Sequence, residues 1–149
     1  MFGSPPENIR QVSPVEVWRD LETSRDAVLV DVRTKPEWQF VGVPDLSALG
    51  KNVVTLEWNR YPDMSIDQGF AEELFRIVGE DGPDRMYFIC RSGQRSMAAA
   101  QCVASTARKV GRVVECINVS EGFEGDRNQR GRRGTVNGWK YRGLDWVQS

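Results

Sequence analysis

Residues 90–96 combine a candidate nucleophile with groups that hold an anion. The segment consists of Cys90, Arg91, Ser92, Gly93, Gln94, Arg95 and Ser96. It follows the apolar run 86–89 and precedes the helix-forming run 97–101. In a loop between a buried strand and a helix, backbone N–H groups and the helix dipole favour negative charge, and so favour the nucleophilic thiolate of cysteine. The sequence therefore predicts a nucleophilic Cys90 in an anion-binding loop whose two arginines add positive charge.

The other residues of this loop have roles that follow from their types. The backbone N–H groups of 91–96 are expected to stabilise negative charge on the sulfur and on a bound substrate. Gly93 is expected to supply a backbone angle closed to other residues, or room for a substrate. Arg95 is expected to brace the loop and to raise its positive potential. Ser96 is expected to be the N-cap of the following helix.

The segments around the loop alternate between strands and helices. Strands are expected at four runs rich in apolar and β-branched residues: 27–32, 52–56, 86–89 and 113–119. Helices are expected at four segments: one that begins at Ser13, and then 37–41, 67–78 and 96–110. Alternation of this kind predicts an α/β domain with a mainly parallel sheet.

The length of the chain, 149 residues, fits one domain, 1–149, with a single core. Residues 1–12 are rich in proline and polar residues and are expected to form a loose lead-in. Residues 121–149 are locally basic and punctuated by glycines. Their aromatic side chains are expected to pack back onto the core, since they carry much apolar area.

Composition and charge narrow the classes of function. A net charge of −1 gives no overall electrostatic case for nucleic-acid or membrane binding. No apolar run reaches the ~18 residues of a membrane span, and the N-terminus lacks the features of a signal peptide, so we expect a cytoplasmic protein. Three cysteines and no histidine argue against a disulfide framework, the usual zinc sites and histidine-dependent catalysis. We expect neither a metal nor a cofactor, and we expect Cys102 and Cys116 to be packing residues.

Several segments together resemble the rhodanese (sulfurtransferase) family. The first is the loop 90–96 in its strand-to-helix context. Another is 29–33, which ends in Asp-x-Arg. The stretches 122–126 and 135–139 are similar to the tail of bacterial single-domain members. The chain is thus identified as resembling a single-domain rhodanese-like sulfurtransferase over nearly its whole length.

This resemblance implies a three-layer α/β/α fold with a mainly parallel five-stranded sheet. It also implies transfer of sulfane sulfur through a persulfide on Cys90, with thiosulfate as donor and cyanide or a thiol as acceptor. On the family pattern Arg91 binds the sulfonate end of thiosulfate and Ser92 hydrogen-bonds the persulfide, in a substrate-binding loop that includes Gln94. The expected partners are therefore a small anionic donor and a thiophilic acceptor. The chain departs from the family at 42–45, where the usual Gly-His-Ile-Pro-Gly segment is shortened and lacks histidine.

Charged residues outside the loop are expected mainly to brace the chain. Asp31 and Arg33 lie at the carboxyl end of a strand, where parallel sheets place their sites, and are expected to support the loop. Arg33 is expected to pair with Glu37, four residues later. The arginines of 127–133 are interpreted as a solvated loop that helps to attract anionic donors, with a nucleic-acid patch as the alternative.

Two rival functions use a similar motif. A cysteine phosphatase or arsenate reductase has five residues between its cysteine and arginine, whereas four separate Cys90 from Arg95. The shorter ring favours a single sulfur atom over a tetrahedral phosphate. A non-catalytic or regulatory rhodanese-like domain is the second alternative, and the presence of the cysteine together with Gly93 and Arg95 argues against it. Between thiosulfate and 3-mercaptopyruvate, the two arginines favour the doubly charged thiosulfate.

Overall fold

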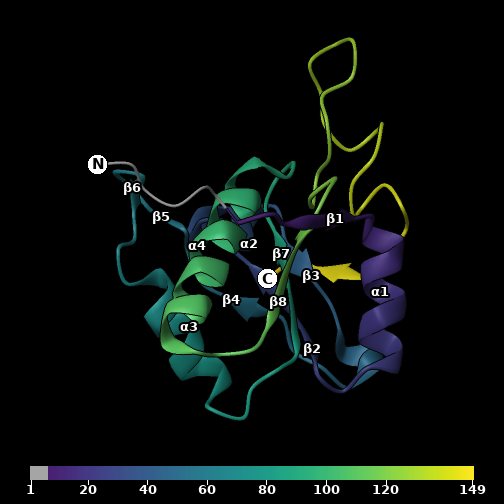
Figure 1. Cartoon of the computed structure of the whole chain (residues 1–149). Coiled ribbons are helices and arrows are strands. Elements are labelled where there is room, and N and C mark those ends of the chain that lie inside the picture. The colour runs from purple at the N-terminus through teal and green to yellow at the C-terminus, as the bar shows by residue number, and fades with distance from the viewer. Residues whose placement is uncertain (1–6) are drawn as a thin grey trace.

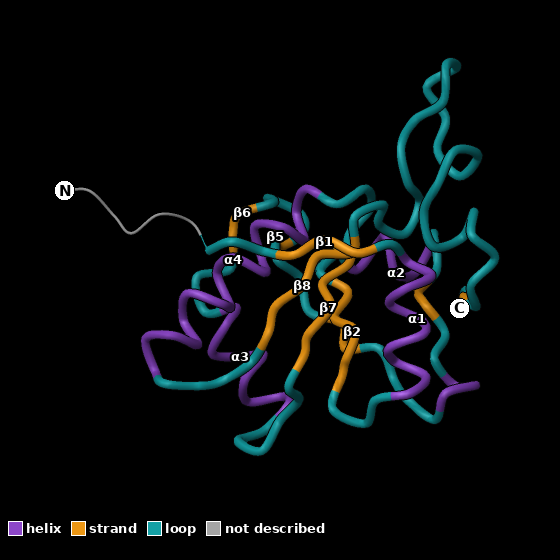
Figure 2. Tube along the Cα trace, turned by 45° about the vertical axis from the view of Figure 1, so that its right-hand side comes forward, coloured by secondary structure: helices purple, strands orange, loops and turns teal. Residues whose placement is uncertain are grey.

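The computed structural model describes residues 7–149, and its centre is a five-stranded sheet (Figure 1, Figure 2). All neighbouring strands of this sheet run parallel, in the order β1-β8-β7-β2-β4. The strands are β1 (Arg10–Val12), β2 (Ala27–Asp31), β4 (Val54–Thr55), β7 (Arg85–Ile89) and β8 (Glu115–Val119). The strands β2, β7 and β8 are almost wholly buried, as expected for strands covered on both faces. The predicted five-stranded, mainly parallel sheet is confirmed.

Helices cover both faces of the sheet and complete three layers (Figure 1). They are α1 (Pro14–Thr23), α2 (Lys35–Phe40), α3 (Phe70–Val78) and α4 (Gln94–Val110), with a 3-10 turn η1 (Ser47–Leu49). On one face, Leu74 of α3 and Val103 of α4 share an apolar cluster with Phe88 of β7. On the other face, Leu21 of α1 shares a cluster with Leu29 of β2. No helix within residues 7–149 has both the length and the apolar character needed to cross a membrane.

The first helix begins as the sequence predicts. Ser13 is its N-cap, and the Ser13 Oγ accepts a hydrogen bond of 3.3 Å from the Glu16 backbone N–H. Pro14 occupies the first turn, where its missing N–H leaves no helical hydrogen bond unmade. The helix therefore starts where the chain leaves β1, and it places its apolar side, with Val17 and Leu21, on the sheet.

Residues 10–12 correct part of the expectation for the N-terminal segment. They form the edge strand β1, which pairs with β8 through Arg10 opposite Ile117 and Val12 opposite Val119. The prediction of a loose segment is therefore wrong for residues 10–12. Three residues are too few to show a strand pattern in the sequence. Residues 1–6 lie outside the described part of the chain.

The C-terminal segment returns to the loop that follows α2. Strand β9 (Trp146–Val147) pairs antiparallel with β3 (Val43–Pro44). Trp139 is fully buried, and its Nε1 donates a hydrogen bond of 2.8 Å to the carbonyl oxygen of Asp145. A separate small hairpin joins β5 (Asn59–Arg60) to β6 (Ser65–Ile66). The tail thus packs on the face of the sheet that α1 also covers.

The carboxyl end of β2 carries a buried ion pair. The Nε and Nη2 atoms of Arg33 donate to the Asp31 carboxylate at 2.9 and 2.7 Å, and both side chains are 0% exposed. Arg33 Nη2 also donates to the carbonyl oxygen of Gly42 at 2.6 Å, and the guanidinium lies 4.2 Å from the centre of the Phe123 ring. The predicted pairing of Arg33 with Glu37 is wrong, because Arg33 turns into the core toward Asp31 instead of lying along the chain surface.

We expect Arg33→Met to destabilise the fold by about 3–5 kcal/mol, because it leaves the buried Asp31 carboxylate without its cation. Urea unfolding followed by circular dichroism measures this free energy. Arg60→Met is the matched control: Arg60 pairs with Asp67 at 3.2 Å but is largely exposed, so the loss there is below about 1 kcal/mol. Equal and small losses in both variants would contradict the structural role of Arg33.

Candidate active site

Cys90 follows the last residue of β7 and lines a small pocket. Its sulfur accepts a hydrogen bond of 3.1 Å from the Gly93 backbone N–H and lies 3.1 Å from the Ser96 Oγ. The residue is only 1% exposed, yet it lines a pocket of about 330 Å³. The pocket is lined by Glu37, Met64, Cys90, Arg91, Ser92, Gln94 and Arg95. The structure therefore brings the predicted loop residues around one sulfur atom.

Two glycines allow this loop to pack tightly against the segment that follows β8. Gly93 has a φ of 111°, and a Cβ there would lie 2.7 Å from the Ser120 carbonyl oxygen. Gly122 has a φ of 71°, and a Cβ there would lie 2.5 Å from the Arg91 carbonyl oxygen. Both the angle and the space exclude a side chain at these positions. The expectation that Gly93 supplies a special backbone angle agrees with this geometry.

Hydrogen bonds between main chains hold the same contact. The Phe123 N–H donates to the Cys90 carbonyl oxygen at 2.8 Å. The N–H groups of Glu124 and Gly125 both donate to the Arg91 carbonyl oxygen, at 3.0 and 3.1 Å. The loop 90–96 is thus fixed by residues more than thirty positions later in the sequence. No local sequence pattern indicates this contact.

Ser96 lies inside α4 and does not cap it. The helix begins at Gln94, and its N-cap is Gly93 in a left-handed conformation, so the prediction of Ser96 as N-cap is wrong. The Ser96 hydroxyl instead donates to Asn118 Oδ1 at 2.5 Å, while Asn118 Nδ2 donates to the Gly93 carbonyl oxygen at 3.0 Å. Asn118, on β8, thereby connects both groups that contact the Cys90 sulfur.

Arg95 is held by Glu37 of α2 in a two-pronged ion pair. Its Nη1 and Nη2 atoms each donate to one carboxylate oxygen at 2.8 Å. Burial raises the pKa of Glu37, but the hydrogen bonds and charge of Arg95, with hydrogen bonds from Thr34, outweigh it and lower this pKa to about 2. The hydrogen bond from Arg95 to Glu37 likewise raises the pKa of Arg95. The positive charge of Arg95 is therefore largely balanced within the protein.

The remaining loop side chains are open to solvent to different degrees. Arg91 and Gln94 are exposed, and Ser92 is half-buried, on the rim of the pocket. Asp31 and Arg33, predicted to support the loop, do not line the pocket; they form a separate buried ion pair. Their connection to Cys90 runs through Phe123, whose ring faces Arg33 and whose N–H bonds the Cys90 carbonyl.

Sequence reasoning missed three residues that shape the site. The first is Glu37, which the sequence predicts as the ion-pair partner of Arg33. The pattern Thr34-x-x-Glu37 is a capping box, and it indicates that Glu37 lies in the first turn of α2. Asn118 lies in an apolar strand, where a lone polar residue signals a buried hydrogen-bond network. Met64, with a positive φ of 60°, reaches the pocket from the β5–β6 hairpin, and the sequence offers no signal for it.

The other two cysteines lie away from this pocket. Burial raises the pKa of Cys116 to about 12, and burial also raises the pKa of Cys102. Both thiols therefore stay protonated and poorly nucleophilic near neutral pH. Among the described residues no group of three or more histidine, cysteine, aspartate or glutamate side chains is placed to hold a metal ion.

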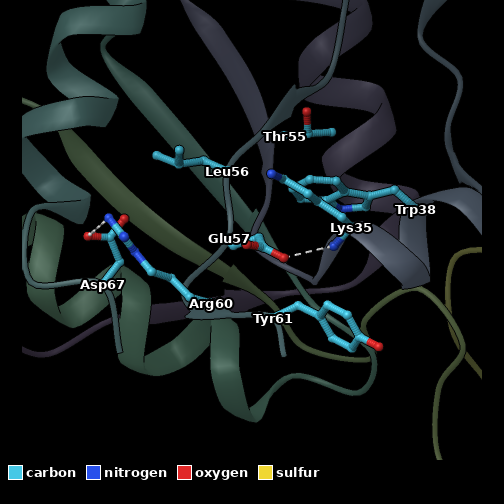
Figure 3. Close-up of a pocket in the computed structure, with 8 residues that line it drawn as sticks. All are labelled: Lys35, Trp38, Thr55, Leu56, Glu57, Arg60, Tyr61 and Asp67. Atoms are coloured by element: carbon cyan, nitrogen blue, oxygen red, sulfur yellow. Dashed lines mark hydrogen bonds and ion pairs between the residues drawn. The ribbon is translucent and has the colours of Figure 1, made fainter. Parts of the chain in front are cut away.

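A second pocket of about 360 Å³ lies beside α2, whose residues Lys35 and Trp38 line it (Figure 3). It shares no lining residue with the Cys90 pocket. Two contacts cross its wall: Arg60 pairs with Asp67 at 3.2 Å, and the Glu57 carboxylate accepts a hydrogen bond of 2.9 Å from the Lys35 backbone N–H (Figure 3). This pocket contains no cysteine, so Cys90 remains the candidate for the thiolate chemistry that the sequence predicts.

Comparisons with known proteins agree with this fold. A family model described as Rhodanese-like domain matches residues 13–129. The uncharacterized protein RC0915 of Rickettsia conorii is 32% identical over 139 residues, which are 93% of this chain and 98% of that protein. The crystal structure of Rv0390 from M. tuberculosis is 40% identical with a TM-score of 0.81, covering 96% of this chain and 100% of that one. The polysulfide-sulfur transferase homodimer from Wolinella succinogenes shares the fold at 21% identity and a TM-score of 0.57, over 95% of this chain and 80% of that one.

We expect Gly93→Ala to destabilise the protein by about 2–4 kcal/mol, because strain at positive φ adds to a clash with the Ser120 carbonyl. Gly50→Ala is the matched control, since Gly50 has a φ of 68° but nothing within 4 Å of the added Cβ. Its cost is about 1 kcal/mol from the backbone angle alone. Urea unfolding of both variants gives the comparison, and equal losses would show that close packing at Gly93 contributes nothing.

The Glu37–Arg95 pair predicts a pH dependence of stability. The pKa of Glu37 falls to about 2 on folding, so its contribution is complete above its ordinary value of 4.5 and is lost as pH falls toward 2. We expect Glu37→Gln to cost about 2 kcal/mol near pH 7, with a smaller difference from wild type near pH 3. Urea unfolding at the two pH values tests this. A gap of the same size at both would argue against the ion pair.

Proposed function

The chain belongs to the rhodanese-like domain family, and on that premise we propose that it is a sulfurtransferase that carries sulfur on Cys90. The proposed donor is thiosulfate, and the proposed acceptor is cyanide or a thiol. The observation that carries this proposal is the setting of the Cys90 sulfur, with the Gly93 N–H and the Ser96 hydroxyl each 3.1 Å away in a pocket that Arg91 and Arg95 also line. Such donors stabilise negative charge on sulfur.

The first half of the proposed reaction loads the cysteine. The Cys90 thiolate attacks the outer sulfur of thiosulfate, a new S–S bond forms, and the bond between the two thiosulfate sulfurs breaks. Sulfite leaves with the electron pair of that bond, and the persulfide retains one negative charge. Arg91 is the proposed partner of the sulfonate, because it is exposed at the rim whereas Arg95 is already paired with Glu37.

The second half returns the enzyme to its starting state. A thiolate or cyanide attacks the outer persulfide sulfur, and Cys90 leaves as a thiolate with the electron pair of the broken S–S bond. The acceptor departs as a persulfide or as thiocyanate. Neither half needs a general base once Cys90 is a thiolate, which suits a chain without histidine. A free thiol nucleophile also suits a reducing compartment, so the cytoplasm is the proposed location.

The size of the loop supports sulfur over phosphate as the group that is bound. Four residues separate Cys90 from Arg95, and Arg95 turns to Glu37 instead of the centre of the loop. A phosphatase needs its arginine free for two oxygens of the substrate. This arrangement favours sulfur transfer over phosphate-ester hydrolysis.

We expect thiosulfate treatment to add one sulfur atom to the wild-type protein and none to Cys90→Ser, because only Cys90 lies in the anion-binding loop. Intact mass spectrometry measures the addition. Cys102→Ser is the matched control and keeps the full gain, since Cys102 lies in α4 outside the Cys90 pocket. Absence of any gain in the wild type would favour the non-catalytic interaction domain, and cleavage of a phosphate ester would favour the phosphatase.

A further inference from the structure

A loop of arginines projects beside the Cys90 pocket. Residues 126–133 form a yellow-green excursion that rises above the body of the molecule (Figure 1) and stands away from the sheet in the turned view as well (Figure 2). We call the loop together with the neighbouring loop residue Arg91 the arginine surface. Its cations are Arg91, Arg127, Arg130, Arg132 and Arg133.

The projecting loop is held in one shape by the side chain and backbone of Asn128. Its Oδ1 accepts from the backbone N–H groups of Arg130 and Arg132 at 2.8 and 3.0 Å. Its Nδ2 donates to Thr135 Oγ1 at 2.8 Å, and its backbone N–H donates to the Arg132 carbonyl oxygen at 2.7 Å. The arginine surface is therefore organised before any partner arrives, which lowers the entropic cost of binding.

The positive charges of this surface are not balanced by ion pairs within the part of the chain that the structure describes. None of the ion pairs formed among residues 7–149 includes any of the five arginines. Burial lowers the pKa of Arg133, and the positive charges of Arg91 and Arg127 lower it further, while Glu124 and Asp126 act in the opposite direction. Such mutual repulsion is relieved by an external anion.

A groove of about 690 Å³ connects this surface to the sulfur site. Arg91, Ser92 and Gln94 line both the groove and the Cys90 pocket. The rest of the groove wall belongs to the projecting loop, including Arg127 and Arg133. A molecule that fills the groove is consequently placed against the loop that carries Cys90.

We propose that the arginine surface docks a protein acceptor that presents a thiol next to an acidic segment. This inference rests on the proposed function and assigns the kind of acceptor to it. Arg130 and Arg132 are exposed and do not line the groove, so a small anion in the groove leaves them without contact, whereas an acidic polypeptide reaches them. RNA fits less well, because no aromatic side chain lines the groove for base stacking.

Once docked, the acceptor thiolate attacks the outer sulfur of the Cys90 persulfide. The S–S bond of the persulfide breaks, Cys90 leaves as a thiolate, and the acceptor leaves as a persulfide. The step has no net oxidation, so it needs no further reagent. The arginines contribute by raising the local concentration of the acidic acceptor and by orienting it.

Binding is tested first, without sulfur chemistry. A fluorescein-labelled peptide of alternating aspartate and glutamate, without cysteine, is titrated with the full chain and followed by anisotropy. We expect saturable binding that weakens with added salt, and at least a tenfold weaker affinity in the triple variant Arg127→Gln, Arg130→Gln, Arg132→Gln. The matched control replaces Arg25, Arg76 and Lys109 by glutamine, three exposed cations outside the groove, and keeps wild-type affinity.

Transfer is tested second, with the same acidic peptide carrying one cysteine and a neutral asparagine–glutamine analogue. The readout is the ratio of the two transfer rates per persulfide-loaded protein, and we expect the triple variant to lose the preference for the acidic peptide. Equal affinities in wild type and triple variant, no saturable binding, or tighter arginine-dependent binding of a single-stranded RNA would each overturn the docking proposal. A wild type that binds the peptide but never loads sulfur would refute the proposed function and leave the docking surface standing.

Discussion

A single buried guanidinium organises the carboxyl edge of the sheet, where the Cys90 sulfur lies. Arg33 is held by Asp31 at the end of β2, by the carbonyl of Gly42 and by the face of Phe123. Phe123 in turn binds the Cys90 carbonyl through its backbone N–H. Removing the charge would leave a carboxylate stranded in the core, so this arrangement has few alternatives. The position of the loop 90–96 thus depends on contacts that lie outside the Cys90 pocket.

The charges around the sulfur fall into two groups with different roles. Arg95 is committed to Glu37, and that pair ties the start of α4 to α2. Arg91, Arg127, Arg130 and Arg132 are exposed, and their charge is available at the surface. One group fixes the geometry of the loop 90–96, and the other leaves positive charge exposed beside the Cys90 pocket.

The sequence alone predicts the features that depend on neighbouring residues in the chain. Alternating strands and helices predicted the parallel sheet, and the spacing of the 90–96 motif located the sulfur between β7 and α4. The predictions from sequence were wrong where contacts between residues far apart in the chain determine the structure. Glu37 has two arginine partners available, one four residues away and one 58 residues away, and burial of Arg33 beside Asp31 selects the distant one. Ser96 is predicted as the helix cap, but the helix begins two residues earlier, after a left-handed turn at Gly93. That turn packs against Ser120, a contact that the local sequence does not show.

The Ser96 hydroxyl and the Gly93 N–H differ in how freely each can donate to an anionic Cys90 sulfur. It has one hydrogen and two acceptors, Asn118 Oδ1 at 2.5 Å and the Cys90 sulfur at 3.1 Å. When Cys90 is a thiol, its S–H donates to the Ser96 Oγ, and the Ser96 hydroxyl donates to Asn118 Oδ1. When the sulfur is anionic, the hydroxyl reaches it only by leaving Asn118 Oδ1 without that donor. The Gly93 N–H faces no such competition, since a backbone donor held by a positive φ has a fixed direction. The geometry that excludes a side chain at Gly93 is therefore the same geometry that aims a permanent donor at the sulfur.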